Sequence, residues 1–342
     1  MDIGLLQNFF RRRSSPLLGI DISAAAIRII ELARLAHGWR VEHFALHELP
    51  RAAMREGGIA QIAQMTDALR EALHKSGTRL REAAIALPAG LVIRKTLTVP
   101  DGLSDEELEL QVEEDAAQSL SIQLSELNLD YGVVGPSVSV PDSVDVMLVA
   151  TRKETIAERQ ELIESVGIKP VVVDIESQAM IAALQTLNNL NDERDSSCTQ
   201  AILQIGRDSS YIYIEKKQIL LFEHELNIGF HKLHKECDKH PEQIVSATET
   251  FCHVACQEFK RALQIYATTA HHSPIDKYFL SGPEQSLSRL PFMLNEQLSI
   301  IVEFANPFRE MTFATSINKA QLLQEASSWL VSCGLAMSDR VA

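Results

Sequence analysis

Long hydrophobic runs are absent from this sequence. No segment approaches the roughly 20 consecutive apolar residues that a membrane-spanning helix needs, so we expect no transmembrane segment. In the opening "MDIGLLQNFFRRRSSP" the basic cluster follows a very short apolar run, which is not the order found in a signal peptide. We expect residues 1–15 to form an N-terminal tag. It is either a frayed end or a short amphipathic segment that touches a membrane surface weakly through residues 1–13.

Basic residues are outnumbered and cysteine is scarce. The chain has 32 Lys and Arg against 46 Asp and Glu, a formal net charge of −14, and such a surface repels the phosphate backbone of nucleic acids. The five cysteines are odd in number and irregularly spaced, which favours a reducing cytoplasm over a disulfide framework. The stretch from His234 to Cys256 matches no established spacing of zinc ligands.

Two domains are expected from the length of 342 residues, and the hydrophobic fraction of 46% is sufficient for two cores. Strand patterns alternate with helix patterns along the chain, which indicates the α/β class. The stretch 17–34, "LLGIDISAAAIRIIELAR", predicts a strand, a tight turn and a second strand, and a third strand follows in 37–49. The same pattern restarts at residue 199, so that Gln204 falls 183 residues after Asp21. We interpret this repeat as a duplicated lobe.

A compositionally distinct block separates the two copies. Pro100 ends a strand, and Ser104 with Glu107 forms a capping-box pattern at the start of a helix. Residues 84–172 therefore predict an inserted small α/β subdomain. The first lobe is expected in residues 16–83 and 173–198. The second is expected in residues 199–342, with a helical region at 241–270.

The turn after Asp21 combines a carboxylate with small side chains, from Ser23 to Ala26. Small side chains leave backbone N–H groups open to phosphate oxygens, and a carboxylate can orient a magnesium ion or its waters. A simpler interpretation also fits, in which the aspartate caps local backbone donors. A third turn, Ser281-Gly282, follows a buried strand. A flat ring could approach its backbone closely, although strand-Gly-Pro is also an ordinary turn.

The order of five segments resembles the signature elements of the actin-like ATPase superfamily: "GIDIS", "VVDIES", "QIGRDSS", "LSGP" and "CGLAM". Within that superfamily the chain is similar, over nearly its whole length, to the PilM family of type IV pilus assembly. The segments "NLDY", "ATRKE" and "GIKPVVVD" are the most specific part of the likeness. The block at 84–172 resembles the extra subdomain of the cell-division protein FtsA.

The resemblance implies two actin-like lobes around a nucleotide cleft, with ATP and magnesium as cofactors. It also implies that the protein grips the N-terminal cytoplasmic peptide of the inner-membrane protein PilN. PilN pairs with PilO, and PilP links to the outer-membrane secretin. No catalytic residue is assigned; Asp21 is the implied magnesium ligand, and Asp174 lies in the connecting element. The implied nucleotide-binding residues are Asp21, Ser23, Ala24, Ala25, Arg28, Glu176, Gln204, Gly206, Ser209, Ser210, Gly229, Lys232, Ser281, Gly282 and Pro283.

Three departures from the family pattern weaken the implied nucleotide site. Gln204 replaces an aspartate, alanines at 24–26 replace hydroxyl side chains, and Pro283 replaces a glycine and has no N–H. If each lost contact costs about 1 kcal/mol, affinity falls on the order of a hundredfold. We therefore expect weak nucleotide binding and little or no hydrolysis.

The favoured interpretation is a scaffold at the cytoplasmic side of the inner membrane that binds the PilN peptide. Its groove is expected between the first lobe and the insert, at Leu91, Ile93, Leu148 and Val149, although these residues also fit a plain core. One alternative is an active actin-like ATPase or sugar kinase, which needs a general base and an intact metal aspartate. Another is an FtsA-like filament former, which needs a C-terminal membrane helix that "AMSDRVA" does not provide.

Overall fold

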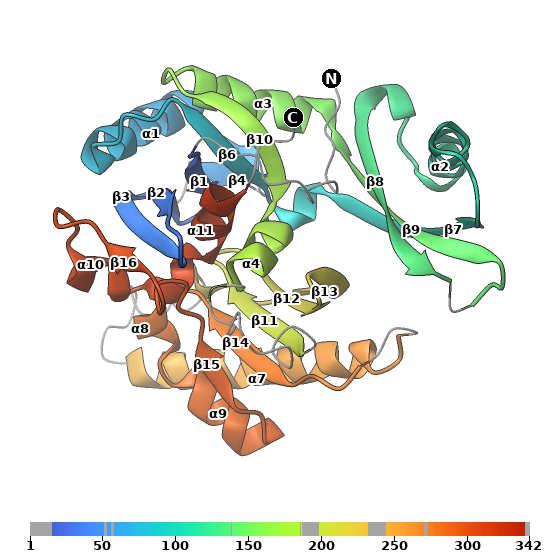
Figure 1. The fold of residues 1–342 in the computed structure, drawn as a ribbon. Helices are drawn as coiled ribbons and strands as arrows, with labels where there is room; N and C mark the ends of the chain where they lie inside the picture. Colours follow the sequence, from blue (N-terminus) through green and yellow to red (C-terminus); the bar gives the residue numbers. More distant parts are fainter. Residues whose placement is uncertain are drawn as a thin grey trace.

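The fold consists of two lobes and a smaller insert that projects to one side (Figure 1). The computed structural model describes residues 16–50, 53–55, 58–137, 139–184, 186, 198–231, 244–269 and 273–338. The expected N-terminal tag and its membrane contact, residues 1–15, lie outside this range. In the described ranges, no helix combines the length and the apolar character needed to cross a bilayer.

A six-stranded sheet forms the first lobe, in the order β10-β6-β1-β2-β3-β16. Strands β1 to β3 form an antiparallel meander, and β6 runs parallel to β1. Two helices cover one face, where apolar residues of alternate strand positions pack against Met65 and Leu162. The bounds are β1 (Leu18–Ile22), β2 (Ala26–Arg34), β3 (Trp39–Glu48), β6 (Glu82–Leu87), β10 (Lys169–Ile175), β16 (Thr312–Phe313), α1 (Ile62–Ser76) and α3 (Lys153–Glu164).

The second lobe repeats this topology. Its sheet order, β13-β12-β11-β14-β15, matches β3-β2-β1-β6-β10 strand for strand, which confirms the expected duplication. Three helices cover its outer face, and Cys252, Cys256 and Phe259 point into that core. The bounds are β11 (Thr199–Ile205), β12 (Ser210–Lys216), β13 (Ile219–Leu226), β14 (Lys277–Ser281), β15 (Val302–Phe304), α7 (Ile244–Tyr266), α8 (Glu284–Leu287) and α9 (Leu290–Leu298).

Two helices, α4 (Glu176–Leu184) and α11 (Leu330–Met337), lie between the sheets and join the lobes (Figure 1). The core around them includes Ile30 of the first sheet and Ile202 of the second. The helices cross very closely at Gly334, where a Cβ would lie 1.7 Å from the carbonyl oxygen of Ala179. Only glycine permits this approach, so Gly334 is required for the close packing of α11 against α4.

The insert is a three-stranded antiparallel sheet, β7-β9-β8, with helix α2 on one face. Its bounds are β7 (Ile93–Pro100), α2 (Asp105–Ser119), β8 (Leu127–Pro136) and β9 (Ser143–Arg152). The predicted capping box is present at the start of α2, because Ser104 Oγ accepts from the Glu107 N–H and the Glu107 carboxylate accepts from the Ser104 N–H. Smaller elements are β4 (Met54–Arg55), β5 (Gly58–Ile59), η1 (Ala89–Leu91), η2 (Leu124–Glu126), α10 (Lys319–Leu323) and η4 (Ala326–Trp329).

The expected domain boundaries need two corrections. The insert is shorter than 84–172, because β6 pairs with β1 and α3 packs on the first sheet; it comprises residues 93–152. The end of the chain does not stay in the second lobe, because β16 pairs with β3 and α11 packs against β1. Both corrections follow from contacts between segments that are far apart in the sequence, so local sequence patterns do not predict them.

Candidate functional site

The turn between β1 and β2 is closed by its own serine. Ser23 Oγ donates to the Ala26 carbonyl at 3.0 Å and accepts from the Ala26 N–H at 3.2 Å. The Ser23 N–H also donates to the Ala26 carbonyl. Ala24 and Ala25 complete the turn without polar side chains. The single hydroxyl of the expected first phosphate loop is therefore already used to hold the turn.

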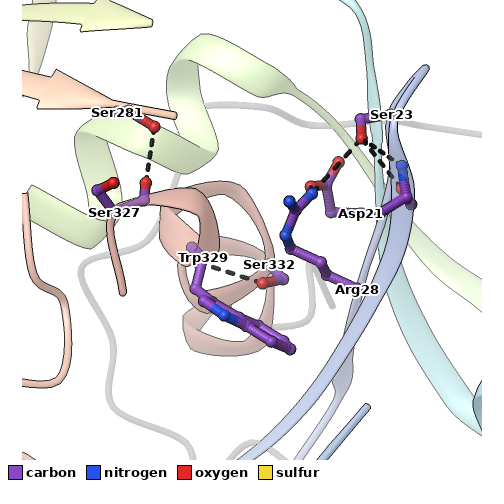
Figure 2. A network of polar contacts seen from close by, with 8 residues as sticks. Asp21, Ser23, Arg28, Ser281, Ser327, Trp329 and Ser332 are labelled. Atoms are coloured by element: carbon purple, nitrogen blue, oxygen red, sulfur yellow. Dashed lines mark hydrogen bonds and ion pairs between the residues drawn. The ribbon is translucent and has the colours of Figure 1, made fainter. Parts of the chain in front are cut away.

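Asp21 lies directly opposite Arg28 in the β1–β2 register, so both side chains share one face of the sheet. Arg28 Nη1 lies 3.7 Å from the Asp21 carboxylate and 3.5 Å from Ser23 Oγ (Figure 2). Burial raises the pKa of Asp21, whose residue is only 5% exposed, and the positive charges of Arg28 and Arg159 oppose that rise. The implied magnesium ligand thus has guanidinium groups as its neighbours.

The connecting element brings a second buried carboxylate, Glu176, to this point, and places the half-buried Asp174 near Arg94. Burial raises the pKa of Glu176, the first residue of α4, to about 7, and the Asp21 charge adds to the rise. Arg159 and the Ala89 N–H act in the opposite direction. Asp174 has its pKa raised to about 6, again by burial. The result is a buried cluster of acids and arginines between the lobes.

Polar groups in the second expected phosphate loop also contact the protein itself. Gln204 Oε1 accepts from the Tyr213 hydroxyl at 3.0 Å. Ser210 Oγ accepts from the Gly206 N–H at 3.2 Å and donates to the Ile228 carbonyl at 2.9 Å.

Glycine is required at two positions here, because added Cβ atoms would meet backbone oxygens. A Cβ on Gly206 would lie 2.3 Å from the carbonyl oxygen of Ser209. A Cβ on Gly229 would lie 2.5 Å from the carbonyl oxygen of Arg207. Gly229 therefore supports the loop by packing. Lys232, expected beside it, lies outside the described residues.

Arg207 is a site residue that the sequence interpretation missed. Its Nη1 donates to the Ala24 carbonyl at 2.5 Å and to the Leu49 carbonyl at 3.1 Å. The side chain leaves the second loop and reaches the first, so it joins the two lobes. The only signal in the sequence was a basic residue directly after Gly206, inside an otherwise small and polar loop.

The expected adenosine turn is fixed by the segment before α11. Ser281 Oγ donates to the Ser327 carbonyl at 2.7 Å (Figure 2), and Ser327 Oγ donates to the Gly282 carbonyl at 2.8 Å. Gly282 has a φ of +144°, which favours glycine, and a Cβ there would lie 2.7 Å from the Ile205 carbonyl. Pro283 stands at the N-cap position of α8, makes no side-chain capping bond there and has no N–H to donate.

The side chains expected to hold magnesium and phosphate already contact other groups of the protein. Within the described ranges, no three His, Cys, Asp or Glu side chains are grouped so that they could hold a metal ion. Asp21 faces Arg28, and the amide oxygen of Gln204 accepts from Tyr213. Magnesium at a nucleotide site usually keeps several waters and takes one or two carboxylates with phosphate oxygens, and here the Asp21 carboxylate is already paired with Arg28.

The expected partner residues do not form one surface. Leu148 is 1% exposed in the insert core under α2, which removes it from any groove. Ile93 is 38% exposed on the same sheet face as Leu148, whereas the register places Val149 beside Arg94 on the opposite face. Leu91 is half-buried in η1, and its carbonyl accepts from the Thr151 hydroxyl at 2.8 Å.

Comparisons with known proteins agree with this architecture. A family model described as type IV pilus assembly protein PilM matches residues 19–340. A solved "PilM-PilN type IV pilus biogenesis complex" has a TM-score of 0.81 and 23% identity, covering 95% of this chain and 98% of that one.

Two further solved structures are more distant. The ethanolamine utilization protein EutJ from Carboxydothermus hydrogenoformans has a TM-score of 0.49 and 13% identity, covering 95% and 92% of the two chains. MreB5 of Spiroplasma citri bound to AMPPNP has a TM-score of 0.45 and 10% identity, covering 95% of each. These two are too distant to carry an argument about function. The match at 0.81 confirms the expected actin-like fold, and because the family model spans nearly all of the sequence, the chain belongs to the family of type IV pilus assembly protein PilM.

Proposed function

We propose that the protein is a cytoplasmic scaffold of the type IV pilus inner-membrane complex. In this proposal it binds the N-terminal peptide of a PilN protein and is linked through PilN to PilO and PilP. The observation that carries the proposal is the family match over residues 19–340. The similar solved structure is a complex of PilM with PilN, which supports the choice of partner.

The peptide surface is proposed at the junction of the first lobe and the insert, where Leu91 and Ile93 lie. Ile93 is a large apolar side chain exposed at the first position of β7, directly after the chain leaves the first lobe. An exposed apolar residue at a junction offers an extended peptide a place to bury a side chain. Val149 lies on the other face of the sheet and marks the alternative surface.

Nucleotide is proposed to bind weakly, and the scaffold role is proposed not to require it. The support comes from two of the three expected loops, the second phosphate loop and the adenosine turn. Gln204, Ser210 and Ser281 each use their polar side-chain atoms within the protein. A phosphate or a metal would first have to displace these contacts, which lowers affinity.

The test is calorimetric titration of a synthetic PilN N-terminal peptide, taken from the same genome, into the pure protein. We expect binding in the micromolar range both with and without Mg-ATP. Ile93→Asp should weaken binding at least about tenfold, because it places a charge where an apolar side chain would be buried. Ile219→Asp is the matched control, since Ile219 is 42% exposed on the second lobe.

Three results would contradict parts of the proposal. Absence of binding under both conditions would remove the scaffold role. A loss of binding in Val149→Asp, with Ile93→Asp unchanged, would move the peptide to the other face of the insert. A micromolar dissociation constant for Mg-ATP alone would show that the nucleotide site is intact.

A further inference from the structure

A single guanidinium connects the two turns that face each other between the lobes. Arg207 Nη1 donates to the carbonyls of Ala24 and Leu49, at 2.5 and 3.1 Å, and both acceptors belong to the first lobe. The side chain of Arg207 is partly buried. Hydrogen bonds from a charged donor are about twice as strong as neutral ones.

Both ends of this connection are fixed to their own lobes. On the second lobe, the Arg207 carbonyl accepts from the His231 N–H at 2.9 Å. The carbonyl of its neighbour Gly206 accepts from the Phe230 N–H at 3.0 Å. On the first lobe, the Leu49 N–H donates to the Ala25 carbonyl at 2.9 Å, so both acceptors of Arg207 belong to one hydrogen-bonded unit. A movement of one lobe away from the other must therefore stretch or break the Arg207 contacts.

We propose that Arg207 is an internal latch that holds the lobes together at the phosphate loops, in place of a bridging nucleotide. The protein's own positive charge crosses from one loop to the other, so the closed arrangement of the lobes needs no ligand. A nucleotide phosphate could enter between the loops only by drawing Arg207 away from the Ala24 carbonyl. This inference concerns the protein alone and does not depend on the proposed peptide partner.

The test is amide hydrogen exchange together with small-angle X-ray scattering on the full chain without nucleotide. In Arg207→Ala we expect exchange about tenfold faster at Ser23, Ala26 and Leu49, the factor that corresponds to about 1.4 kcal/mol of lost contact. We also expect a larger radius of gyration. Arg289→Ala is the matched control, because Arg289 forms an exposed ion pair with Glu249 in the second lobe, and it should change neither measurement.

The outcomes decide the proposal. Unchanged exchange and radius in Arg207→Ala would overturn it. Faster exchange throughout β11 and β12, without a larger radius of gyration, would also overturn it. Arg207 would then stabilise the second lobe itself and would not hold the two lobes together. If the alanine variant does not fold, Arg207→Gln gives the same readouts, since its shorter neutral side chain cannot reach the Ala24 carbonyl.

Discussion

Some ionisable side chains are buried between the two lobes, where the core of a globular protein is usually apolar. Asp21 and Glu176 are both buried; burial raises the pKa of Glu176, and the charge of Asp21 raises it further. Arg28 and Arg159 lie close enough to offset part of the desolvation of Asp21. A buried acid without full compensation is held near its neutral form, so Glu176 should titrate close to neutral pH.

This cluster predicts a pH-dependent stability. The pKa of Glu176 is about 7 in the folded protein against an ordinary value of 4.5, so the folded state binds more protons between these values. Stability is therefore highest below about pH 4.5 for this group and is lost as pH rises through about 7, by up to about 3 kcal/mol. Glu176→Gln copies the neutral form and should show less loss of stability between pH 5 and pH 8 in urea unfolding.

The comparison needs a control for the many exposed acids. Glu126→Gln serves, because its side chain is 54% exposed in an ion pair with Arg152. Its unfolding curves should keep the pH dependence of the unsubstituted protein. If Glu176→Gln keeps it as well, the buried carboxylate is not the group that titrates.

At the scale of elements, local signals were reliable where local contacts decide the structure. Ser104 and Glu107 predicted the start of α2, and their side chains form the reciprocal cap there. The ends of the insert were not predictable in this way. Whether β6 pairs with β1, or α3 lies on the first sheet, depends on residues distant in the chain. Turn residues such as Gly206 were found from the sequence, whereas the reach of Arg207 to Ala24 was not.

Helix α2 should depend measurably on its cap. Ser104→Ala removes the side-chain acceptor of the Glu107 N–H and should cost about 1 kcal/mol, seen as roughly fivefold faster amide exchange in the first turn of α2. Ser119→Ala is the control at the other end of the same helix. The Ser119 hydroxyl has no hydrogen-bond partner among the described residues, so its loss should leave exchange unchanged. Equal effects of the two substitutions would show that the capping box contributes nothing.

For the whole molecule, the duplicated strand order was predictable because each copy consists of short turns between adjacent strands. The return of α11 to the first lobe was not, because it depends on the close crossing of Gly334 over Ala179. Polar contacts between the three parts of the molecule are also not revealed by the sequence. Arg94 makes one of them: it leaves the insert at β7 and pairs with Glu223 of β13 in the second lobe.

Arg94 should therefore decide how firmly the insert is attached. Besides its ion pair with Glu223, its Nη2 donates to Ser177 Oγ of α4 at 2.5 Å. The Arg94 side chain is 12% exposed and the Glu223 side chain 21%. Removing one partner of a mostly buried pair leaves the other uncompensated, so Arg94→Ala should lower the free energy of unfolding by about 2 kcal/mol.

Differential scanning calorimetry checks this at the scale of the whole protein, with hydrogen exchange to locate the effect in β7 and β9. Arg152→Ala is the matched control, because Arg152 also lies in the insert but pairs with Glu126 at the surface, where an ion pair contributes little. We expect the Arg94 variant to melt earlier and to exchange faster in the insert, while the Arg152 variant behaves like the unsubstituted protein. If both variants melt alike, the polar contacts of Arg94 do not contribute to the attachment of the insert.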